Sequence, residues 1–260
     1  MKVRILRQSS PASEAYWETF LADAPGDMSI AGLIDHLNHV ENIVNGDGAA
    51  TTPIGWECSC LQGDCGGCAM VINGMPALAC ETFLRDLKGG EVVLQPLQKF
   101  PVIHDLVVDR SIIQDNLLRT DMYIGSNQAP RDRVETNGEI KPDDKDKAES
   151  KAKLNGKAKP RSQKKAEQEF QHQYAAAKCL KCGLCLEVCP NYVDGQTFFG
   201  ALFANDCYLV SARNPGKAAS VKESYRSHFG NGCSKSLSCM DVCPAQIPTI
   251  ASIAKLNRGR

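Results

Sequence analysis

The sequence predicts an α+β protein made of two small domains, the first built on a mixed sheet and the second all-helical. Two observations lead to this expectation. The thirteen cysteines fall into two groups, at residues 58–80 and 179–243, with none between them. Strand-like alternation of apolar residues appears around the first group, whereas apolar residues around the second recur at helical spacing. A chain of 260 residues is long enough for each domain to bury a core of its own.

Composition disfavours several classes of protein. The formal net charge is zero and the pI is about 6.9, so no global field attracts nucleic acid or anionic lipid. No stretch approaches the roughly 20 apolar residues of a membrane span, and the first ten residues lack the apolar run of a signal peptide. Without an export signal the cysteines are expected to stay reduced, and their odd number leaves one unpaired, so a disulfide framework is disfavoured.

The elements of the first domain are expected in order along residues 1–108. The segment KVRIL alternates as a strand, and a second apolar run occupies residues 16–21. Apolar residues at helical spacing predict an amphipathic helix that starts at the N-cap Ser29 and extends to Val44. After the cysteines, AMVINGMPALAC predicts two short strands around the tight turn Asn73-Gly74, and EVVLQPL predicts another strand. This order resembles the β-grasp of plant-type ferredoxins.

Residues 109–168 are expected to connect the domains, with a mobile lysine-rich insertion at about 137–168. From Lys141 to Gln168 the chain holds nine lysines and one arginine against five acids, and Leu154 is its only large apolar residue. Such a segment cannot bury enough surface to offset the entropy of ordering it. A lysine-rich run could also dock nucleic acid or acidic lipid, but this one has no aromatic residues, so no nucleic-acid partner is expected.

Residues 169–260 predict the all-helical domain. FFGALFANDCYLVSAR and PTIASIAKLNR have helical patterns, and the cysteine runs lie just before or between such segments. Both runs close with Cys-x3-Cys-Pro, at Cys189-Pro190 and Cys243-Pro244, which indicates a duplicated motif. Cys207 falls within a helical apolar stretch and is expected to be a small core residue.

The first cysteine run has the spacing Cys-x4-Cys-x2-Cys with a fourth cysteine further on, which is the plant-type pattern for a [2Fe-2S] cluster. The expected ligands are Cys60, Cys65, Cys68 and Cys80. Glycines within the run are expected to let the backbone wrap the cluster and direct N–H donors at its sulfides. They are Gly63, Gly66 and Gly67. Zinc would more often be held by two Cys-x2-Cys pairs separated by a longer spacer. Cys58 lies outside the pattern and is expected to be a spare thiol.

The run CLKCGLCLEVCP has the bacterial ferredoxin spacing, in which three thiolates hold one cubane and the fourth, before proline, reaches a second cluster. That second cluster requires a second run, which is CSKSLSCMDVCP. Here Ser236 occupies the position of the middle thiolate, so three thiolates remain, which suits [3Fe-4S]. The expected [4Fe-4S] ligands are Cys179, Cys182, Cys185 and Cys243. The expected [3Fe-4S] ligands are Cys189, Cys233 and Cys239.

Residues for substrate chemistry are not apparent in this sequence. The five histidines are scattered, and the chain has no Gly-x-Gly-x-x-Gly fingerprint for a flavin or nicotinamide. No catalytic residue is therefore expected. The ordered set of three clusters predicts a chain that moves electrons between an oxidising and a reducing centre that both lie elsewhere.

At this point the sequence resembles the iron–sulfur subunit of the succinate dehydrogenase and fumarate reductase family. The resemblance covers nearly the whole chain and rests on CSCLQGDCGGCAMVINGMPALAC, on PLQKFPVIHDLVVDRS and on the two C-terminal runs. It implies an N-terminal β-grasp plant-type ferredoxin domain plus a C-terminal all-α-helical ferredoxin domain. It also implies a partner flavoprotein with covalently bound FAD that interconverts succinate and fumarate. The [3Fe-4S] end would face quinone near membrane-anchor subunits, on the cytoplasmic side of the cell membrane.

Departures from the family pattern lie near the expected quinone end. Quinone-reducing succinate dehydrogenases tend to carry tryptophan just after the first Cys-Pro, where this chain has NYVD at residues 191–194. The family's usual lysine after the last Cys-Pro is Ala245, and a frequent histidine is Ser234. These differences favour a fumarate-reductase type that uses menaquinone. The alternatives are the same three-cluster chain serving a related flavin reductase with another substrate or a non-quinone acceptor, and a non-redox zinc or nucleic-acid protein.

Overall fold

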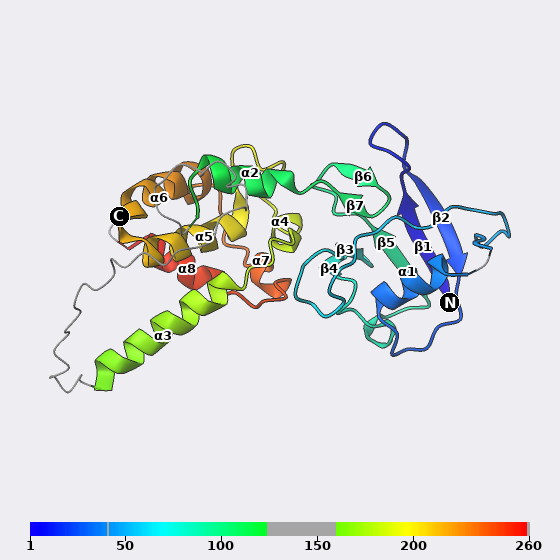
Figure 1. Ribbon diagram of the computed structural model, residues 1–260, viewed down its shortest axis with the longest axis horizontal. Helices are drawn as coiled ribbons and strands as arrows, with labels where there is room; N and C mark the ends of the chain where they lie inside the picture. Colours follow the sequence, from blue (N-terminus) through cyan, green and yellow to red (C-terminus); the bar gives the residue numbers. More distant parts are fainter. Residues whose placement is uncertain (41, 124–159, 259–260) are drawn as a thin grey trace, which may run out of the picture.

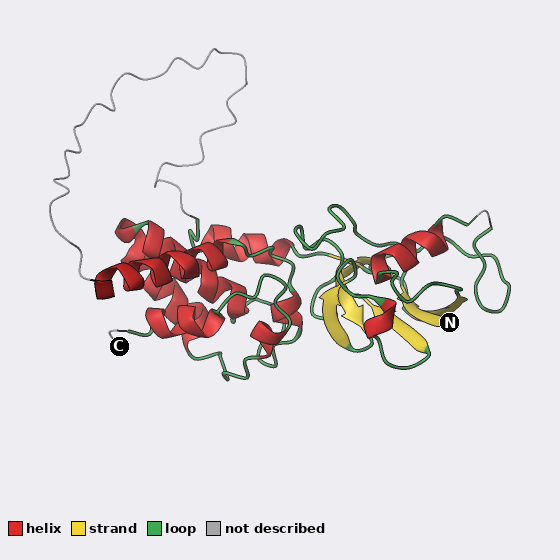
Figure 2. Cartoon of the chain, turned by 90° about the horizontal axis from the view of Figure 1, so that it is seen from below, coloured by secondary structure: helices red, strands yellow, loops and turns green. Residues whose placement is uncertain are grey.

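The computed structural model has two lobes and describes residues 1–40, 42–123 and 160–258. The sheet and helix α1 form one lobe, and helices α2 to α8 form the other (Figure 1). The same division between strands and helices is seen from below in Figure 2. This arrangement confirms the expected α+β class, with a mixed sheet first and a helical part second. Within the described residues, no helix is both long and apolar enough to cross a membrane.

The first lobe contains a five-stranded sheet with the order β2-β1-β5-β3-β4. Its strands are β1 (Lys2–Arg7), β2 (Tyr16–Leu21), β3 (Ala69–Ile72), β4 (Met75–Leu78) and β5 (Glu91–Gln95). Four of them were predicted as strands from the sequence, and β2 coincides with the second apolar run. β1 pairs antiparallel with β2 and parallel with β5, so the strand that comes last in the sequence lies in the middle of the sheet. A separate two-stranded sheet follows, formed by β6 (Val102–His104) and β7 (Val107–Val108).

Helix α1 (Ile30–Asn38) packs its apolar face into the same core as the sheet. Ser29 caps it as predicted, because its hydroxyl accepts a hydrogen bond from the Gly32 N–H at 3.1 Å. The expected extension to Val44 is wrong. The Asn38 side chain exchanges hydrogen bonds of 2.9 and 2.7 Å with the backbone of Ile54, which fixes the end of the helix against the chain that leads into the cysteine loop.

The second lobe is helical, and its centre is α5, which is buried on every side from Gly200 to Val210. This burial explains why the apolar residues of α5 are not confined to one face of the helix. Helices α3, α6 and α8 pack on α5, and the short helices α4 and α7 carry cysteines. The helices are α2 (Ser111–Arg119), α3 (Pro160–Ala177), α4 (Leu184–Glu187), α5 (Gly200–Arg213), α6 (Ala218–Tyr225), α7 (Ser238–Asp241) and α8 (Thr249–Leu256). Shorter helical turns are η1 (Leu84–Asp86), η2 (Pro215–Lys217) and the π-turn η3 (Arg226–Gly230).

Helix α3 starts at Pro160, inside the segment expected to be an unstructured linker. Residues 160–168 are therefore helical, and that part of the expectation is wrong. The helix is held by its later residues: Glu169 pairs with Lys255 of α8, and His172 lies 3.0 Å from the Ser252 hydroxyl. These tertiary contacts override a lysine-rich composition that by itself predicts no core. The preceding part of the lysine-rich segment, up to residue 159, lies outside the described residues.

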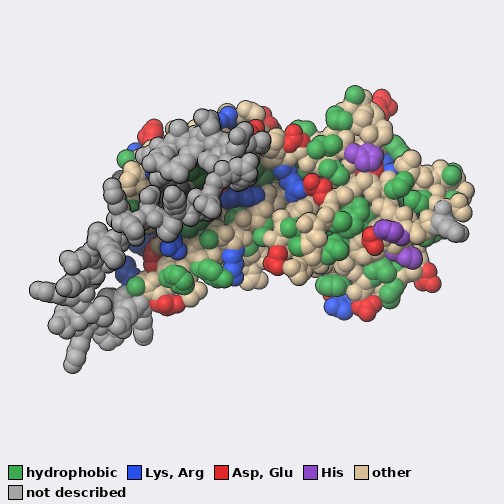
Figure 3. Space-filling view, viewed as in Figure 1, with side chains coloured by type: hydrophobic (Ala, Val, Ile, Leu, Met, Phe, Trp, Pro, Cys, Tyr) green, Lys and Arg blue, Asp and Glu red, His purple; other side chains and the backbone are tan. Residues whose placement is uncertain are grey.

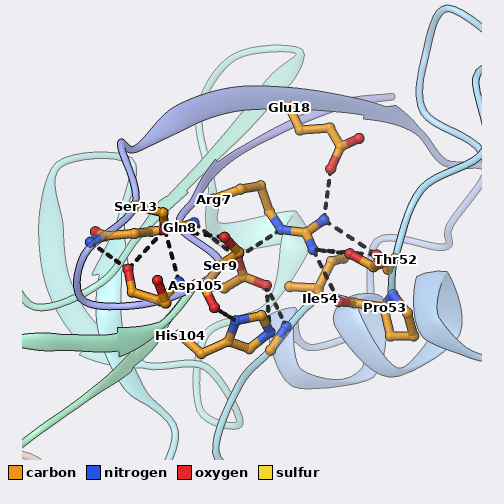
Figure 4. Close-up of polar contacts among 12 residues, drawn as sticks. Arg7, Gln8, Ser9, Ser13, Glu18, Thr52, Pro53, Ile54, His104 and Asp105 are labelled. Atoms are coloured by element: carbon orange, nitrogen blue, oxygen red, sulfur yellow. Dashed lines mark hydrogen bonds and ion pairs between the residues drawn. The ribbon is translucent and has the colours of Figure 1, made fainter.

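A buried ion network anchors the chain just before the first cysteine loop (Figure 4). Arg7, 1% exposed, lies between Glu18 at 2.7 Å and Asp105 at 3.0 Å, and also donates to the Thr52 and Pro53 carbonyls. Asp105 in turn accepts the Gly55 N–H at 2.8 Å. Breaking a buried charge pair by removing one partner is costly. The network therefore holds β1, the 104–105 turn and the start of the cysteine loop in one arrangement.

The two lobes meet through charged side chains. On the face seen in Figure 3, basic and acidic side chains lie side by side at the junction. Glu187 of α4 accepts the backbone N–H groups of Gln98 and Lys99, each at 3.0 Å, and the Lys99 ammonium donates to the Cys189 carbonyl. The chain leaving the sheet is thus bound directly to the second group of cysteines.

Candidate functional site

The first cysteine run forms a loop at the end of the sheet that faces the helical lobe. Cys60 and Cys65 lie in the loop, Cys68 immediately precedes β3, and Cys80 follows β4. The Sγ atoms of Cys68 and Cys80 are 3.3 Å apart and both side chains are buried, whereas Cys65 is exposed. The β3–β4 hairpin therefore brings these two thiols together, because they flank its open end.

Backbone N–H groups point at the outer thiols of this loop. The Gln62 and Asp64 N–H groups lie 3.5 and 3.3 Å from Cys60 Sγ, and the Gly67 N–H lies 3.4 Å from Cys65 Sγ. The Gln62 N–H, with smaller contributions from the Cys65 thiol and the Asp64 N–H, lowers the pKa of Cys60 to about 7. The opposite holds inside, where burial and the hydrogen bond with Cys68 raise the pKa of Cys80 to about 12.

The glycines expected to shape this loop differ in conformation. Gly63 and Gly66 have φ values of +78° and +75°, which favour glycine. Gly67 has no such φ, and its contribution is the N–H that it donates to Cys65. Gly63 and Gly66 therefore allow the turn, while the backbone N–H groups of Gly63 and Gly67 act on the Cys80 and Cys65 sulfurs.

A hollow between α4, α5 and the last cysteine run is lined by thiols predicted to hold the [4Fe-4S] cluster. They are Cys179, Cys182, Cys185 and Cys243, with Cys239 at the edge. Burial raises the pKa of Cys182 to about 11 and raises the pKa of Cys185 well above that of an ordinary thiol. A bound cation reverses this effect, because a thiol that coordinates a metal is deprotonated outright. The donor set therefore fits a multi-iron cluster.

A second hollow contains the thiols predicted for the [3Fe-4S] cluster, Cys189, Cys233 and Cys239, and Ser236 lines it with them. Burial, followed by the charges of Cys189 and Cys233, raises the pKa of Cys239 to about 11. The serine thus faces the same space as the three sulfurs, which agrees with a site that lacks one thiolate. The thiols surround hollows rather than a point: within residues 1–40, 42–123 and 160–258, no three His, Cys, Asp or Glu side chains form a site for a single metal ion.

The two remaining cysteines lie apart from these sites. Cys58 is exposed on the approach to the first loop and lines neither hollow. Cys207 is fully buried in α5, with its Sγ 3.7 Å from Met122 Sδ, so the predicted core role is confirmed.

Three cations that contact the cysteine runs were missed by sequence reasoning. Lys181, between two expected ligands, pairs with Asp206 of α5. Lys99 donates to the Cys189 carbonyl, and Arg110 donates to the Cys182 carbonyl. A lysine inside CLKC was a visible signal, but the other two act on backbone carbonyls far away in the sequence, and nothing in the local pattern reveals them.

Known proteins match the chain in sequence and in fold. Residues 2–115 match the family profile described as a 2Fe-2S iron-sulfur cluster binding domain. The chain is 31% identical to the succinate dehydrogenase iron-sulfur subunit of Bacillus subtilis, over 98% of this chain and 90% of that protein. It is 29% identical to the fumarate reductase iron-sulfur subunit of Haemophilus influenzae, over 100% of this chain and 91% of that one.

Among solved structures, a chain of the Mycobacterium smegmatis Sdh1 complex in the apo form aligns with a TM-score of 0.67 at 22% identity. The alignment covers 98% of this chain and 94% of that chain. At this level of identity, the match supports the same fold along the whole chain.

Proposed function

Because this chain belongs to the family of succinate dehydrogenase and fumarate reductase iron–sulfur subunits, we propose that it is the electron-transfer subunit of such a complex. In this proposal electrons pass between an FAD-containing flavoprotein subunit and quinone, with a fumarate-reductase type that uses menaquinone favoured. The observation that supports the proposal most is that thiols gather at three places in the structure: the first cysteine loop and the two hollows of the helical lobe. Each place is lined by cysteines that the spacing assigns to one cluster.

The residues proposed to hold the clusters follow the spacing and the hollows. Cys60, Cys65, Cys68 and Cys80 would hold [2Fe-2S]; Cys179, Cys182, Cys185 and Cys243 would hold [4Fe-4S]; and Cys189, Cys233 and Cys239 would hold [3Fe-4S]. When bound, such clusters supply one-electron transfer at potentials set by charge, hydrogen bonds and solvent. The chain's own contribution is to hold the sulfurs and to direct backbone N–H donors at several of them, among them Cys60, Cys233 and Cys243.

The proposed domains follow the same division. They are a β-grasp [2Fe-2S] domain over 1–108, a connecting segment over 109–168, and an α-helical ferredoxin domain over 169–260. Helix α2 and the start of α3 fall within the connecting segment but belong to the helical lobe (Figure 1). The proposed partners are the flavoprotein and one or more membrane-anchor subunits. The proposed place is the cytoplasmic side of the cell membrane, with attachment through those partners.

Affinity purification of the tagged chain under anaerobic conditions tests this function. We expect a brown complex that contains a protein with covalently bound flavin and one or more hydrophobic subunits. We also expect EPR signals of a reduced [2Fe-2S] cluster and of an oxidised [3Fe-4S] cluster. A colourless chain without iron, or a complex without a flavoprotein, would overturn the proposal.

A non-quinone acceptor is a second candidate, and it is supported by the side chains that follow the first Cys-Pro. Tyr192 is 2% exposed and its ring packs 6.1 Å from that of Phe100, so the aromatic residue here turns into the core. Val193 is 73% exposed. Purification of the native complex with its flavoprotein but without hydrophobic subunits would favour this candidate.

A further inference from the structure

Arg110 lies where the two lobes meet, and its guanidinium donates to both of the neighbouring cysteine loops. Its Nη1 lies 2.9 Å from the carbonyl oxygen of Gly66 in the first loop and 3.3 Å from that of Cys182 in the second. Its Nη2 lies 3.4 Å from the Gly67 carbonyl and pairs with the Glu57 carboxylate. Because a guanidinium is a rigid planar fork, these contacts fix the two loops relative to each other.

The two loops also touch directly beside Arg110. A Cβ added to Gly66 would lie 2.7 Å from the Cβ of Cys182 and 3.2 Å from that of Leu180. Glycine is therefore required here for close approach as well as for its positive φ. Gly66 directly follows the proposed ligand Cys65, and Cys182 is a proposed ligand of the next cluster. This contact is thus a short covalent and van der Waals route from one proposed site to the other.

We propose that Arg110 is a positioning residue for electron transfer between the [2Fe-2S] and [4Fe-4S] sites, and that the Gly66–Cys182 contact it secures is where the two sites couple. This inference rests on the proposed function, because it requires both loops to hold their clusters. Each transfer oxidises one cluster by one electron and reduces the other by one, and no proton or covalent bond moves.

The charge of Arg110 adds a second effect. Its side chain is 17% exposed, so its positive charge is poorly screened at the junction. Reduction adds negative charge to a cluster, and a nearby cation favours the reduced form. Arg110 therefore raises the potential of both clusters, while Glu57, 44% exposed, opposes it in part. The charges of Arg110 and Glu57 therefore shift the cluster potentials in opposite directions. Their ion pair nevertheless helps to keep Arg110 in place between the two loops.

Substitution of Arg110 in the whole complex separates position from charge. Arg110→Gln removes the charge and the fork. Arg110→Lys keeps a charge, but its side chain is one bond shorter and carries one nitrogen in place of two, so it loses the Nη2 contacts with Gly67 and Glu57 and holds the loops less firmly. Arg119→Gln is the matched control, because Arg119 on α2 donates to the Gln196 carbonyl and lies over the Phe199 ring, touching neither loop. For each variant we would measure the magnetic coupling between the two reduced clusters by EPR and the potential of each cluster by redox titration.

In Arg110→Gln we expect weaker coupling and an equilibrium constant for reduction of each cluster that is about tenfold lower, which is about 59 mV for one electron. In Arg110→Lys we expect weaker coupling with potentials close to wild type, and in Arg119→Gln no change in either. Wild-type coupling and potentials in Arg110→Gln would overturn the inference. If Arg110→Gln loses its clusters, the test depends on Arg110→Lys, and wild-type coupling in Arg110→Lys would overturn the inference.

Hydrogen exchange of the metal-free chain supplies a readout that needs no cluster. We expect Arg110→Gln to exchange several-fold faster than wild type in both loops, at residues 60–68 and 179–189. If Arg110→Gln and wild type exchanged at the same rate in both loops, Arg110 would not hold the loops together. Absence of both clusters from the wild-type complex would instead contradict the proposed function and leave exchange to decide the role of Arg110.

Discussion

The first cysteine loop and the two hollows of the second lobe differ in how their surroundings affect the ionisation of thiols, although backbone N–H groups also lie beside Cys233 and Cys243 in the second lobe. In the first loop, backbone N–H groups lower the pKa of Cys60 to about 7. In the hollows, burial raises the pKa of Cys182 and Cys239 to about 11. The first loop therefore offers a thiolate before any metal arrives, whereas the inner thiols depend on the positive charge of iron to lose their protons.

Both effects, the lowered and the raised thiol pKa, occur within the first cysteine run itself. Cys80 belongs to the sheet lobe, but its pKa is raised to about 12 by burial and by the contact with Cys68. Solvent access and N–H donation, rather than the lobe to which a cysteine belongs, therefore decide how readily its thiol ionises.

The largest expected effect concerns the second hollow, the proposed [3Fe-4S] site, where Ser236 stands in place of a fourth thiolate. Ser236 lines this hollow with three proposed ligands, so Ser236→Cys should supply a fourth thiolate. The oxidised-state EPR signal of a [3Fe-4S] cluster should then disappear, because [4Fe-4S]2+ is silent. Ser238→Cys is the control, since Ser238 does not line the hollow and should leave the signal intact. An unchanged signal in Ser236→Cys would place the open iron corner elsewhere.

The difference in thiol ionisation should appear as a difference in alkylation rate. In the metal-free chain at pH 7.5, a thiol with a pKa of 7 is about three-quarters thiolate, whereas one with a pKa of 11 is ionised roughly a thousandfold less. Iodoacetamide should therefore label Cys60 at least a hundredfold faster than Cys239, as followed by mass spectrometry. The Cys60 rate should rise with pH up to about 8 and then level off, because its pKa is lowered. Equal rates would refute the contrast between the two regions.

A smaller effect than in the two preceding predictions is expected at the contact between the lobes, where Glu187 of α4 meets the chain that leaves the sheet. Glu187 accepts two backbone N–H groups at 3.0 Å, and Glu187→Gln leaves one neutral acceptor. Because the site is partly exposed, we expect a loss of about 1–2 kcal/mol in the free energy of unfolding. Denaturant unfolding measures this loss. Glu223→Gln is the control, because Glu223 is 73% exposed and its ion pair with Arg226 is long, at 3.9 Å. A similar loss of unfolding free energy in both variants would show that the Glu187 contact does not stabilise the junction between the lobes.

The smallest expected effect lies in the helical lobe, away from the cysteines. Burial opposes the shift, but hydrogen bonds from Lys255, Tyr208 and Gln173 overcome it and lower the pKa of Glu169 to about 2. A lowered pKa stabilises the fold above the ordinary value of 4.5, and this stabilisation is lost as pH falls towards 2. Glu169 is 39% exposed, so solvent screening reduces the contribution to about 1 kcal/mol.

Glu169→Gln tests this contribution in the metal-free chain, which avoids acid damage to clusters. The variant should be less stable than wild type at pH 7, and the difference should shrink between pH 4.5 and pH 3. A difference that does not depend on pH would assign the loss to packing instead of charge.

Local chemistry was predictable from the sequence, and distant partners were not. The strands, the Ser29 cap and the burial of Cys207 follow from patterns that neighbouring residues create. The end of α1 at Asn38 and the start of α3 at Pro160 did not follow, because each depends on contacts with another part of the chain. Cysteine spacing predicted sets of thiols that line common hollows in the structure. Arg110, in contrast, acts on backbone carbonyls, which every residue possesses and no motif marks.

The position of β5 in the middle of the sheet has a consequence for the order of events during synthesis. β5 pairs with both β1 and β3, and it is made after all four cysteines of the first site. At a synthesis rate of about 5–20 residues per second, Gln95 emerges about 1–3 s after Cys80. Until then no strand lies between β1 and β3, and the sheet is incomplete. Arrival of β5 joins the β3–β4 hairpin, which Cys68 and Cys80 flank, to β1, so all the cysteines of this loop are synthesised before the sheet that supports them can close.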